Sequence, residues 1–120
     1  MTLTDKFYSK FEDNSKAFCR EVFKDINSEE FRRIYVTIVA NKRAGILPRP
    51  SSLIYFKNYY EPDEFEKMMI KSLEQRDFKA KEDITALEEF KAVKKGLTRK
   101  EYRALIRKQV HEKALSLLGL

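Results

Sequence analysis

A stretch interrupted by prolines, residues 27–60, limits the possible folds of this chain more than any other feature. Gly45 can end a helix in the left-handed conformation, because a residue without a Cβ adopts positive φ at little steric cost. Pro48 and Pro50 then oppose continuation, since proline lacks an N–H and disfavours the α conformation in the residue before it. The residues before Gly45 place apolar side chains at i, i+3, i+4, i+7 and i+8, one face of a helix: Phe31, Ile34, Tyr35, Ile38 and Val39.

These features predict two helices joined at a rigid elbow at residues 48–50. Asn27 or Ser28 can cap the first helix, and Glu30 stands three residues after Asn27, as in a capping box. Pro50 suits the first position of the second helix. That second helix would carry its apolar residues at helical spacing: Leu53, Phe56 and Tyr60.

Helical spacing also recurs before this stretch. Thr4 is a candidate cap for a first helix that carries Phe7 and Phe11. The polar residues 13–15 offer a break and a new cap. A second amphipathic face follows: Phe18, Val22, Phe23 and Ile26.

Three more helices are predicted after the elbow. Pro62 with the acids around it begins a helix whose buried stripe is Phe65, Met68, Met69 and Leu73. Asp83 can cap the next helix, which ends at Gly96 and has the apolar face Ile84, Leu87 and Phe90. Thr98 and Glu101 form a capping box for a long last helix. Its apolar face is Tyr102, Leu105, Ile106, Val110, Ala114 and Leu117.

We therefore predict an all-α fold, a compact bundle of six or seven short amphipathic helices around an aromatic-rich core. Its 120 residues suggest one domain. Residues 1–60 form an aromatic and basic half that contains the elbow. Residues 61–120 form an acidic helix followed by a basic helical hairpin.

Several functional classes are disfavoured. Apolar runs are far shorter than the roughly 20 residues of a membrane span, and the N-terminus has no apolar signal region, so we expect a cytoplasmic protein. Cys19 is the single cysteine and is expected to be a small buried hydrophobe. His111, the single histidine, is expected to be a partly exposed helical residue. Without a nucleophile motif or a glycine-rich loop, we expect no enzymatic activity, no cofactor and no metal site.

Charge is distributed unevenly along the chain. Residues 61–90 carry 5 basic and 10 acidic groups, a net charge of −5, whereas residues 91–113 carry 9 basic and 2 acidic groups, a net charge of +7. Such polarity indicates a charged partner on one side, although solvated helix faces that neutralise one another would give the same pattern.

The basic C-terminal hairpin, residues 86–107, has the outline of a helix-turn-helix, in which the second helix reads the major groove of DNA. Arginine can bind guanine edges, and lysine can neutralise phosphates. The candidate nucleic-acid-binding residues are Arg99, Lys100, Arg103 and Arg107. The alternative is an ordinary helical hairpin with a basic outer face.

Aromatic residues next to cations follow the elbow, among them Tyr55 and Tyr59 beside Lys57. Such rings can stack on single-stranded bases, each contact contributing roughly 1–3 kcal/mol. Alternatively, Phe56 and Tyr60 pack inward while Tyr55 and Tyr59 serve a protein interface, where tyrosine is enriched.

The elbow sequence L-P-R-P-S-S-L-I-Y-F, preceded by a helix that opens on N-S-E-E-F-R-R, resembles a known family. It is similar to the N-terminal region of phage replicative-helicase loaders and loader-inhibitors, such as replication protein P of lambdoid phages. The similarity covers about residues 15–60. Its elements are the cap at Ile26-Asn27-Ser28-Glu29, the amphipathic helix from Phe31 to Val39, the elbow at residues 48–51 and the aromatic Phe56.

This resemblance implies a small adaptor that binds a hexameric replicative helicase in the bacterial host cytoplasm and loads or modulates it. Such an adaptor needs surfaces rather than chemistry, and a rigid elbow lowers the entropy lost on docking. The expected anchors around the elbow are Arg43, Arg49, Tyr55, Lys57 and Tyr59. A regulator that binds nucleic acid through the last helix, and a phage inhibitor that docks on a host or defence protein, remain alternatives.

Overall fold

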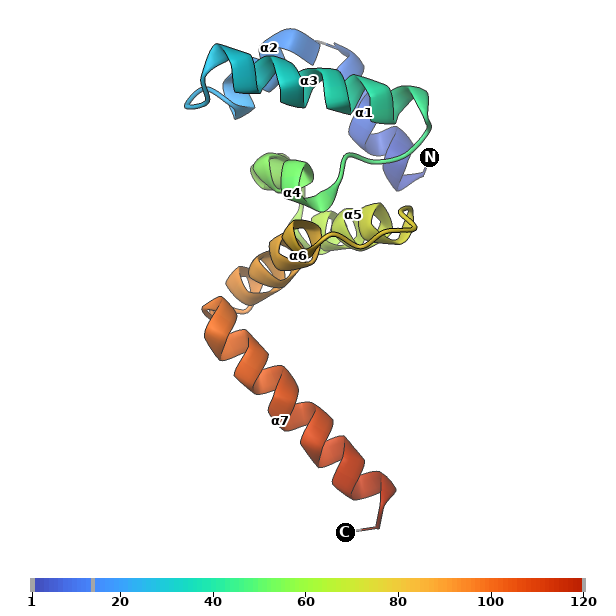
Figure 1. The fold of residues 1–120 in the computed structure, drawn as a ribbon, viewed down its shortest axis with the longest axis vertical. Coiled ribbons are helices and arrows are strands. Elements are labelled where there is room, and N and C mark those ends of the chain that lie inside the picture. The colour runs from blue at the N-terminus through green and yellow to red at the C-terminus, as the bar shows by residue number, and fades with distance from the viewer. Residues whose placement is uncertain (1, 14, 120) are drawn as a thin grey trace. The chain divides into compact units, whose positions relative to one another are not determined.

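The computed structural model describes residues 2–13 and 15–119, with the side chains of all of these except residues 12, 13, 15, 16, 18 and 19. It contains no strand in these two ranges, so the all-α prediction is confirmed (Figure 1). The helices are α1 (Leu3–Asp13), α2 (Ser15–Val22), α3 (Ser28–Arg43), α4 (Pro50–Leu53), the 3-10 helix η1 (Ile54–Tyr59), α5 (Pro62–Glu74), α6 (Lys81–Lys94) and α7 (Arg99–Leu117).

The chain forms two compact units, residues 1–87 and residues 88–120. We call them the N-terminal unit and the C-terminal unit. The boundary lies within α6, so the first turns of this helix belong to one unit and its last turns to the other. The sequence predicts a single domain, with its two halves meeting at residue 60.

The core of the N-terminal unit is built from aromatic rings. Phe56 is fully buried, and its ring meets the Phe7 ring edge-on at 5.1 Å and the Phe23 ring edge-on at 5.5 Å. Phe7 also stacks on Tyr60, which in turn stacks on Phe65 of α5. Edge-to-face and offset arrangements are the favourable ones for aromatic pairs. One cluster therefore connects α1, the end of α2, η1 and α5.

The start of α1 differs from the prediction. Thr2, not Thr4, caps this helix: its hydroxyl accepts a hydrogen bond from the Asp5 backbone N–H, and its own N–H donates to the Asp5 carboxylate. Asp5 stands three residues after Thr2, the spacing of a capping box, whereas the residue three after Thr4 is Phe7. Helix α1 ends at Asp13 and α2 begins at Ser15, and the break predicted between them falls on residue 14, outside the described residues. The predicted burial of Phe18 and Cys19 falls outside the described side chains.

Helix α3 has the predicted ends. The Asn27 side chain accepts a hydrogen bond from the Glu30 backbone N–H at 2.9 Å, and Gly45 takes the left-handed conformation with φ of 75°. Ile38 is fully buried, whereas the other four residues of the predicted face are half-buried.

The second helix of the elbow begins at Pro50 as predicted, but it does not continue as an α-helix. After Leu53 the chain tightens into η1. A 3-10 helix repeats every three residues, so Leu53 and Phe56 fall on the same side, and both are fully buried. The uniform α-helical spacing expected from Leu53 to Tyr60 is therefore wrong, because core packing selects the tighter turn.

Helix α5 buries Phe65, Met68 and Met69 as expected, and Leu73 is half-buried. In the C-terminal unit, Gly96 ends the turn after α6 with φ of 72°. Thr98 and Glu101 form the reciprocal capping box of α7. All three predictions are confirmed.

The apolar face predicted for α7 is largely exposed. Tyr102 is buried, but Ile106, Val110 and Leu117 have exposed fractions of 37%, 62% and 79%. Within the C-terminal unit, α7 has only the last turns of α6 and the turn at Gly96 beside its first residues. Its 19 residues extend beyond that support, so most of the stripe stays uncovered there. His111 is exposed on this helix.

Candidate functional site

Side chains from distant helices fix the backbone of the elbow. The Tyr8 hydroxyl donates a 2.6 Å hydrogen bond to the Ile46 carbonyl. Gln75 accepts from the Leu47 N–H at 2.8 Å, and Arg76 donates to the Leu47 carbonyl at 2.7 Å. The Ser72 hydroxyl, fully buried, donates to the Pro48 carbonyl. Because these groups satisfy polar backbone atoms inside the protein, the elbow is a rigid junction.

Asp83 completes this junction from α6. Its carboxylate accepts hydrogen bonds of 3.1 and 3.2 Å from the Arg49 Nε and of 3.1 Å from the Ser51 backbone N–H. Only 2% of the Asp83 side chain is exposed. Burial favours the neutral form, but the bonds from Arg49 and Ser51 outweigh it and keep the pKa of Asp83 below its usual value.

The prediction that Asp83 caps its own helix is therefore wrong. Helix α6 starts at Lys81, which leaves Asp83 inside the first turn. Its carboxylate instead binds an N–H in the first turn of α4, where the N-cap residue Arg49 makes no side-chain cap. Pro50 has no N–H, and the N–H groups of Ser52 and Leu53 donate to the Arg49 carbonyl. The Ser51 N–H is therefore left for this carboxylate.

The five residues predicted as partner anchors lie in different environments. Arg43, Tyr55 and Lys57 are exposed. Arg49 is engaged by Asp83, and its guanidinium also lies 4.0 Å from the Glu82 carboxylate. Tyr59 is half-buried, and its carbonyl accepts a hydrogen bond from Lys10. Their role in binding a partner stays a prediction.

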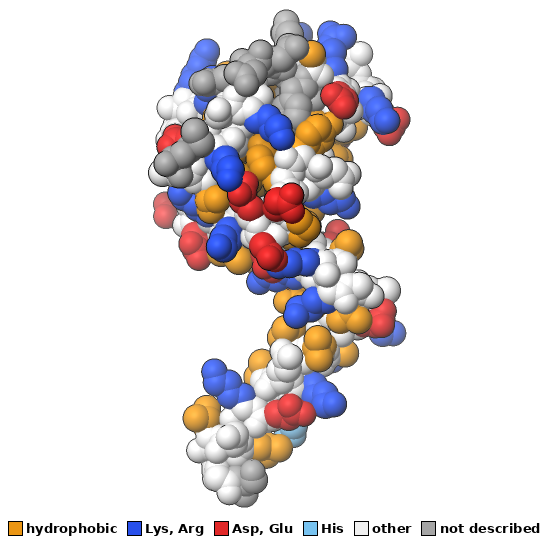
Figure 2. Space-filling view, turned by 180° about the vertical axis from the view of Figure 1, so that it is seen from behind, with side chains coloured by type: hydrophobic (Ala, Val, Ile, Leu, Met, Phe, Trp, Pro, Cys, Tyr) orange, Lys and Arg blue, Asp and Glu red, His pale blue; other side chains and the backbone are white. Residues whose placement is uncertain are grey.

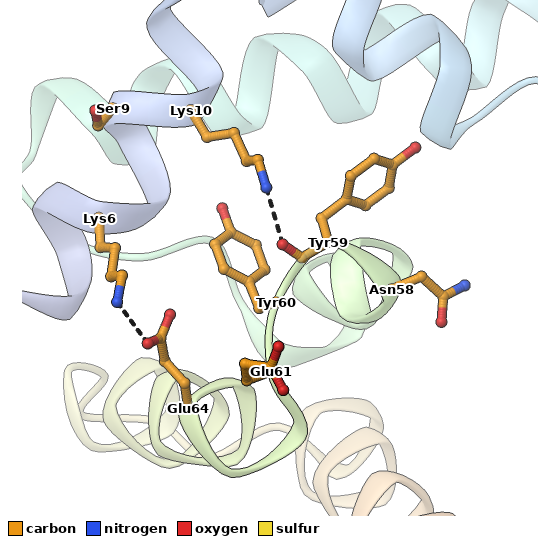
Figure 3. A pocket seen from close by; sticks show the side chains of 8 residues that line it. All are labelled: Lys6, Ser9, Lys10, Asn58, Tyr59, Tyr60, Glu61 and Glu64. Atoms are coloured by element: carbon orange, nitrogen blue, oxygen red, sulfur yellow. Dashed lines mark hydrogen bonds and ion pairs between the residues drawn. The ribbon is translucent and has the colours of Figure 1, made fainter.

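A small hollow lies between α1, η1 and the start of α5 (Figure 3). Lys6 pairs with Glu64 at 2.5 Å, and Lys10 donates to the Tyr59 carbonyl at 2.9 Å. The Tyr60 hydroxyl points toward α1 and has no hydrogen-bond partner among the described atoms. Burial, followed by the charge of Glu64, raises the pKa of this hydroxyl well above its usual range. Both lysines of the hollow thus serve contacts within the unit.

The four residues predicted to bind nucleic acid come together on α7. Arg99, Lys100, Arg103 and Arg107 line one hollow, which they alone form. Their spacing of three, four and seven or eight residues places them on one side of the helix. We call these four residues the basic cluster.

Glu88 of α6 orients two members of the basic cluster. Its carboxylate accepts from the Arg103 Nε at 2.8 Å and from the Arg99 Nε at 3.3 Å. These hydrogen bonds lower the pKa of Glu88, and the bond from Arg103 has the larger effect. Lys100 and Arg107 make no ion pair with any described residue and are exposed. One carboxylate thus pairs with two of the four cations, and the cluster keeps an excess of positive charge.

The position of these cations is unfavourable for the helix itself. Arg99 and Lys100 lie in the first turn of α7, where the helix dipole favours acidic side chains. Each such cation costs typically 0.3–1 kcal/mol. Exposed apolar residues lie between the cations along α7, which Figure 2 shows as orange among blue. The sequence thus places cations where the stability of α7 does not favour them.

A comparison with family models, characterised proteins and solved structures finds no match to this chain. In the described ranges, no helix combines the length and apolar character that a bilayer crossing needs. The same residues contain no group of three or more His, Cys, Asp or Glu side chains that could hold a metal ion.

Sequence reasoning identified the cations of α7 but missed the acidic residues that organise the two sites. Asp83 stands 34 residues from Arg49, and Glu88 stands 11 and 15 residues from Arg99 and Arg103. The one signal available in the sequence was that each of the two predicted basic sites would need a nearby carboxylate to hold its arginine side chains. Local sequence indicated Asp83 only as a helix cap, and nothing local distinguishes Glu88 from the other acids of residues 61–90.

Proposed function

We propose that this protein is a non-enzymatic nucleic-acid-binding adaptor whose contact surface is the basic cluster of α7. The observation that carries the proposal is the convergence of four cations on one hollow against a single carboxylate. Phosphate groups are the partners that such a cluster suits, since arginine forks bind phosphate oxygens and lysine acts as a point charge.

The dimensions of the cluster agree with this partner. From Arg99 to Arg107 the helix axis advances about 12 Å. B-DNA presents roughly seven phosphates over that length when both strands are counted. The major groove, about 12 Å wide, admits an α-helix. Two cations are held in place by Glu88, and Lys100 and Arg107 are left to move onto phosphates.

The test is binding of labelled duplex and single-stranded DNA by fluorescence anisotropy at several salt concentrations. If four phosphates are neutralised, the affinity for duplex falls about a hundredfold between 50 and 200 mM salt. Lys100→Ala and Arg107→Ala should each weaken binding and reduce the salt slope by about one.

Lys108→Ala is the matched control, because Lys108 is exposed on the same helix but does not line the hollow. It removes the same charge from the protein as Lys100→Ala. If Lys108→Ala and Lys100→Ala lost the same affinity for DNA, the net positive charge of the protein, not the basic cluster, would drive binding. Absence of binding to both DNA forms at low salt would overturn the proposal.

A second candidate is the helicase adaptor that the elbow sequence suggests. The exposed positions of Arg43, Tyr55 and Lys57 next to a rigid junction favour it, because a preorganised surface loses little entropy on docking. Arg49 is a poor reporter of this function, since its removal also disturbs Asp83.

The helicase candidate is tested by size exclusion with a purified bacterial replicative helicase from the natural host of this protein. The wild-type protein should comigrate, and the double variant Arg43→Glu, Lys57→Glu should not. Lys67→Glu, exposed on α5, controls for added negative charge. If the wild-type protein elutes alone, the helicase is not its partner, and the proposed role of the basic cluster is unaffected.

A further inference from the structure

A second basic surface lies in the N-terminal unit, lined by residues from the end of α2 to the first turns of α3. Figure 1 shows where these two helices lie. It is a groove of about 680 Å³, within the usual size range of binding clefts. Its apolar lining consists of Phe23, Ile26, Phe31, Tyr35 and Val36. We call this surface the aromatic groove.

Cations stand around the apolar lining. Arg20, Lys24 and Arg32 line the groove, and all three are exposed. No carboxylate is among its described lining residues. The acids at the start of α3, Glu29 and Glu30, instead line a separate hollow together with Arg33. The aromatic groove therefore combines an apolar lining with an uncompensated positive rim.

The apolar lining is accessible at its outer end. Val36 has an exposed fraction of 57%, and Phe31 and Tyr35 are half-buried. Only 3% of Phe23 is exposed, and its ring packs edge-on against Phe56. This contact anchors the lining to the aromatic core. A partly open apolar groove on a rigid base is typical of sites that receive the apolar face of a helix.

We propose that the aromatic groove binds an acidic amphipathic helix of a partner protein. The apolar stripe of that helix would cover Phe31, Tyr35 and Val36. Its flanking Asp or Glu residues would pair with Arg20, Lys24 and Arg32. This inference concerns a different surface from the basic cluster and does not depend on nucleic-acid binding.

Helices α5 and α7 of a second copy of this chain do not fit the groove. The exposed apolar stripe of α7 is flanked by the basic cluster, which would face the positive rim with like charge. Helix α5 is acidic in its first turn, but its apolar residues Phe65 and Met68 are fully buried and cannot insert. A foreign acidic helix satisfies both the charge and the apolar requirement.

Single-stranded nucleic acid is the other anionic partner to consider. Base stacking requires free ring faces. Phe31 stacks on Tyr35 at 6.1 Å with an interplanar angle of 17°, and the Arg20 guanidinium lies 6.0 Å from the Phe31 centroid. Two neighbours thus already contact the Phe31 ring. The Tyr35 ring also stacks on Phe11 at 6.1 Å, and Phe23 is buried, so the other rings of the lining are occupied as well. These features favour a helix over bases.

The test uses labelled synthetic peptides of about 16 residues with the full-length chain, followed by fluorescence anisotropy. The probe carries Leu at i, i+4 and i+7 flanked by Glu. One control peptide replaces Glu by Lys, and another has the probe composition in scrambled order. The probe should bind about tenfold more tightly than either control, because both the stripe and the acids are needed.

Protein variants locate the binding. Arg32→Glu and Val36→Asp should weaken probe binding about tenfold. Arg33→Glu is the matched control: it is the exposed neighbour of Arg32 on α3 but lines the other hollow. The double variant Lys100→Ala, Arg107→Ala should bind the probe as the wild type does, which separates this surface from α7. Circular dichroism melting of each variant should match the wild type, since the changed side chains are exposed.

Three results would overturn the inference. One is equal binding of the probe and both control peptides. Another is a loss of binding in Arg33→Glu as large as in Arg32→Glu. The third is that the probe does not bind, whereas a labelled single-stranded oligonucleotide binds the wild type but neither Arg32→Glu nor Val36→Asp. That result would assign the aromatic groove to nucleic acid.

Discussion

Arginine serves two opposite purposes in this protein, at the elbow and on α7. Arg49 meets a carboxylate that is 2% exposed, and Arg76 donates to the Leu47 carbonyl inside the same junction. Arg103 and Arg107 belong to an exposed helix face, where Glu88 engages Arg103 and no described residue pairs with Arg107. The elbow arginines hold backbone and buried charge in place, whereas Arg103 and Arg107 lie exposed on the surface of α7.

The difference shows that the burial of the opposing group, rather than the residue type, decides what an arginine does. A buried carboxylate loses its hydration and depends on the cation beside it. An exposed carboxylate keeps its hydration and gains little from the pair, usually less than about 1 kcal/mol. The same side chain therefore matters for stability at the elbow and contributes little to stability on α7.

The largest expected effect comes from Arg49→Ala. This change leaves the buried Asp83 carboxylate without its main partner, and we expect the free energy of unfolding to fall by about 2–3 kcal/mol. The figure is below that for a fully buried pair because 42% of the Arg49 side chain is exposed. Urea unfolding followed by circular dichroism measures it.

Arg107→Ala is the matched change on α7 and should alter the free energy of unfolding by less than about 0.5 kcal/mol. Glu82→Ala tests the other neighbour of Arg49, whose carboxylate is 4.0 Å away and 73% exposed, and should be equally mild. If Arg49→Ala and Arg107→Ala lowered the free energy of unfolding by similar amounts, the proposed difference between the elbow and α7 would be wrong.

A smaller effect is expected from Thr98→Ala. The Thr98 hydroxyl accepts from the Glu101 N–H at 3.1 Å, and loss of an N-cap costs about 1 kcal/mol. Because the cap belongs to α7, hydrogen exchange should accelerate in the first turns of α7 and stay unchanged at the buried helices α4 and α5. Faster exchange throughout both units would contradict this local role.

The smallest expected effect is a dependence of stability on acid pH. The pKa of Asp83 is lower in the folded protein than its ordinary value of 3.8. Its contribution is therefore fully present above the unfolded pKa and is lost as the pH falls through the folded value. Between pH 5 and pH 2.5, urea unfolding should show a steeper loss for the wild type than for Asp83→Asn, whose side chain does not titrate. Parallel slopes for the two proteins would exclude Asp83 as a source of acid sensitivity.

The sequence by itself determined the features that depend on near neighbours. The two ends of α3, the start of α7, the turns at Gly45 and Gly96 and the start of α4 at Pro50 follow from side chains within three or four residues. Caps, left-handed glycines and prolines act through local backbone geometry, so their chemistry can be read along the chain. The gathering of Arg99, Lys100, Arg103 and Arg107 on one face follows from helical spacing alone.

Only the tertiary structure decided which of these groups are buried and what they meet. It brought Asp83 to Arg49 across 34 residues, tightened η1 so that Phe56 enters the core, and formed the aromatic groove from α2 and α3. It also left the apolar stripe of α7 exposed within its unit, although its spacing predicts a buried face. Burial depends on which distant segments supply the neighbours, and periodicity along one helix contains no information about them.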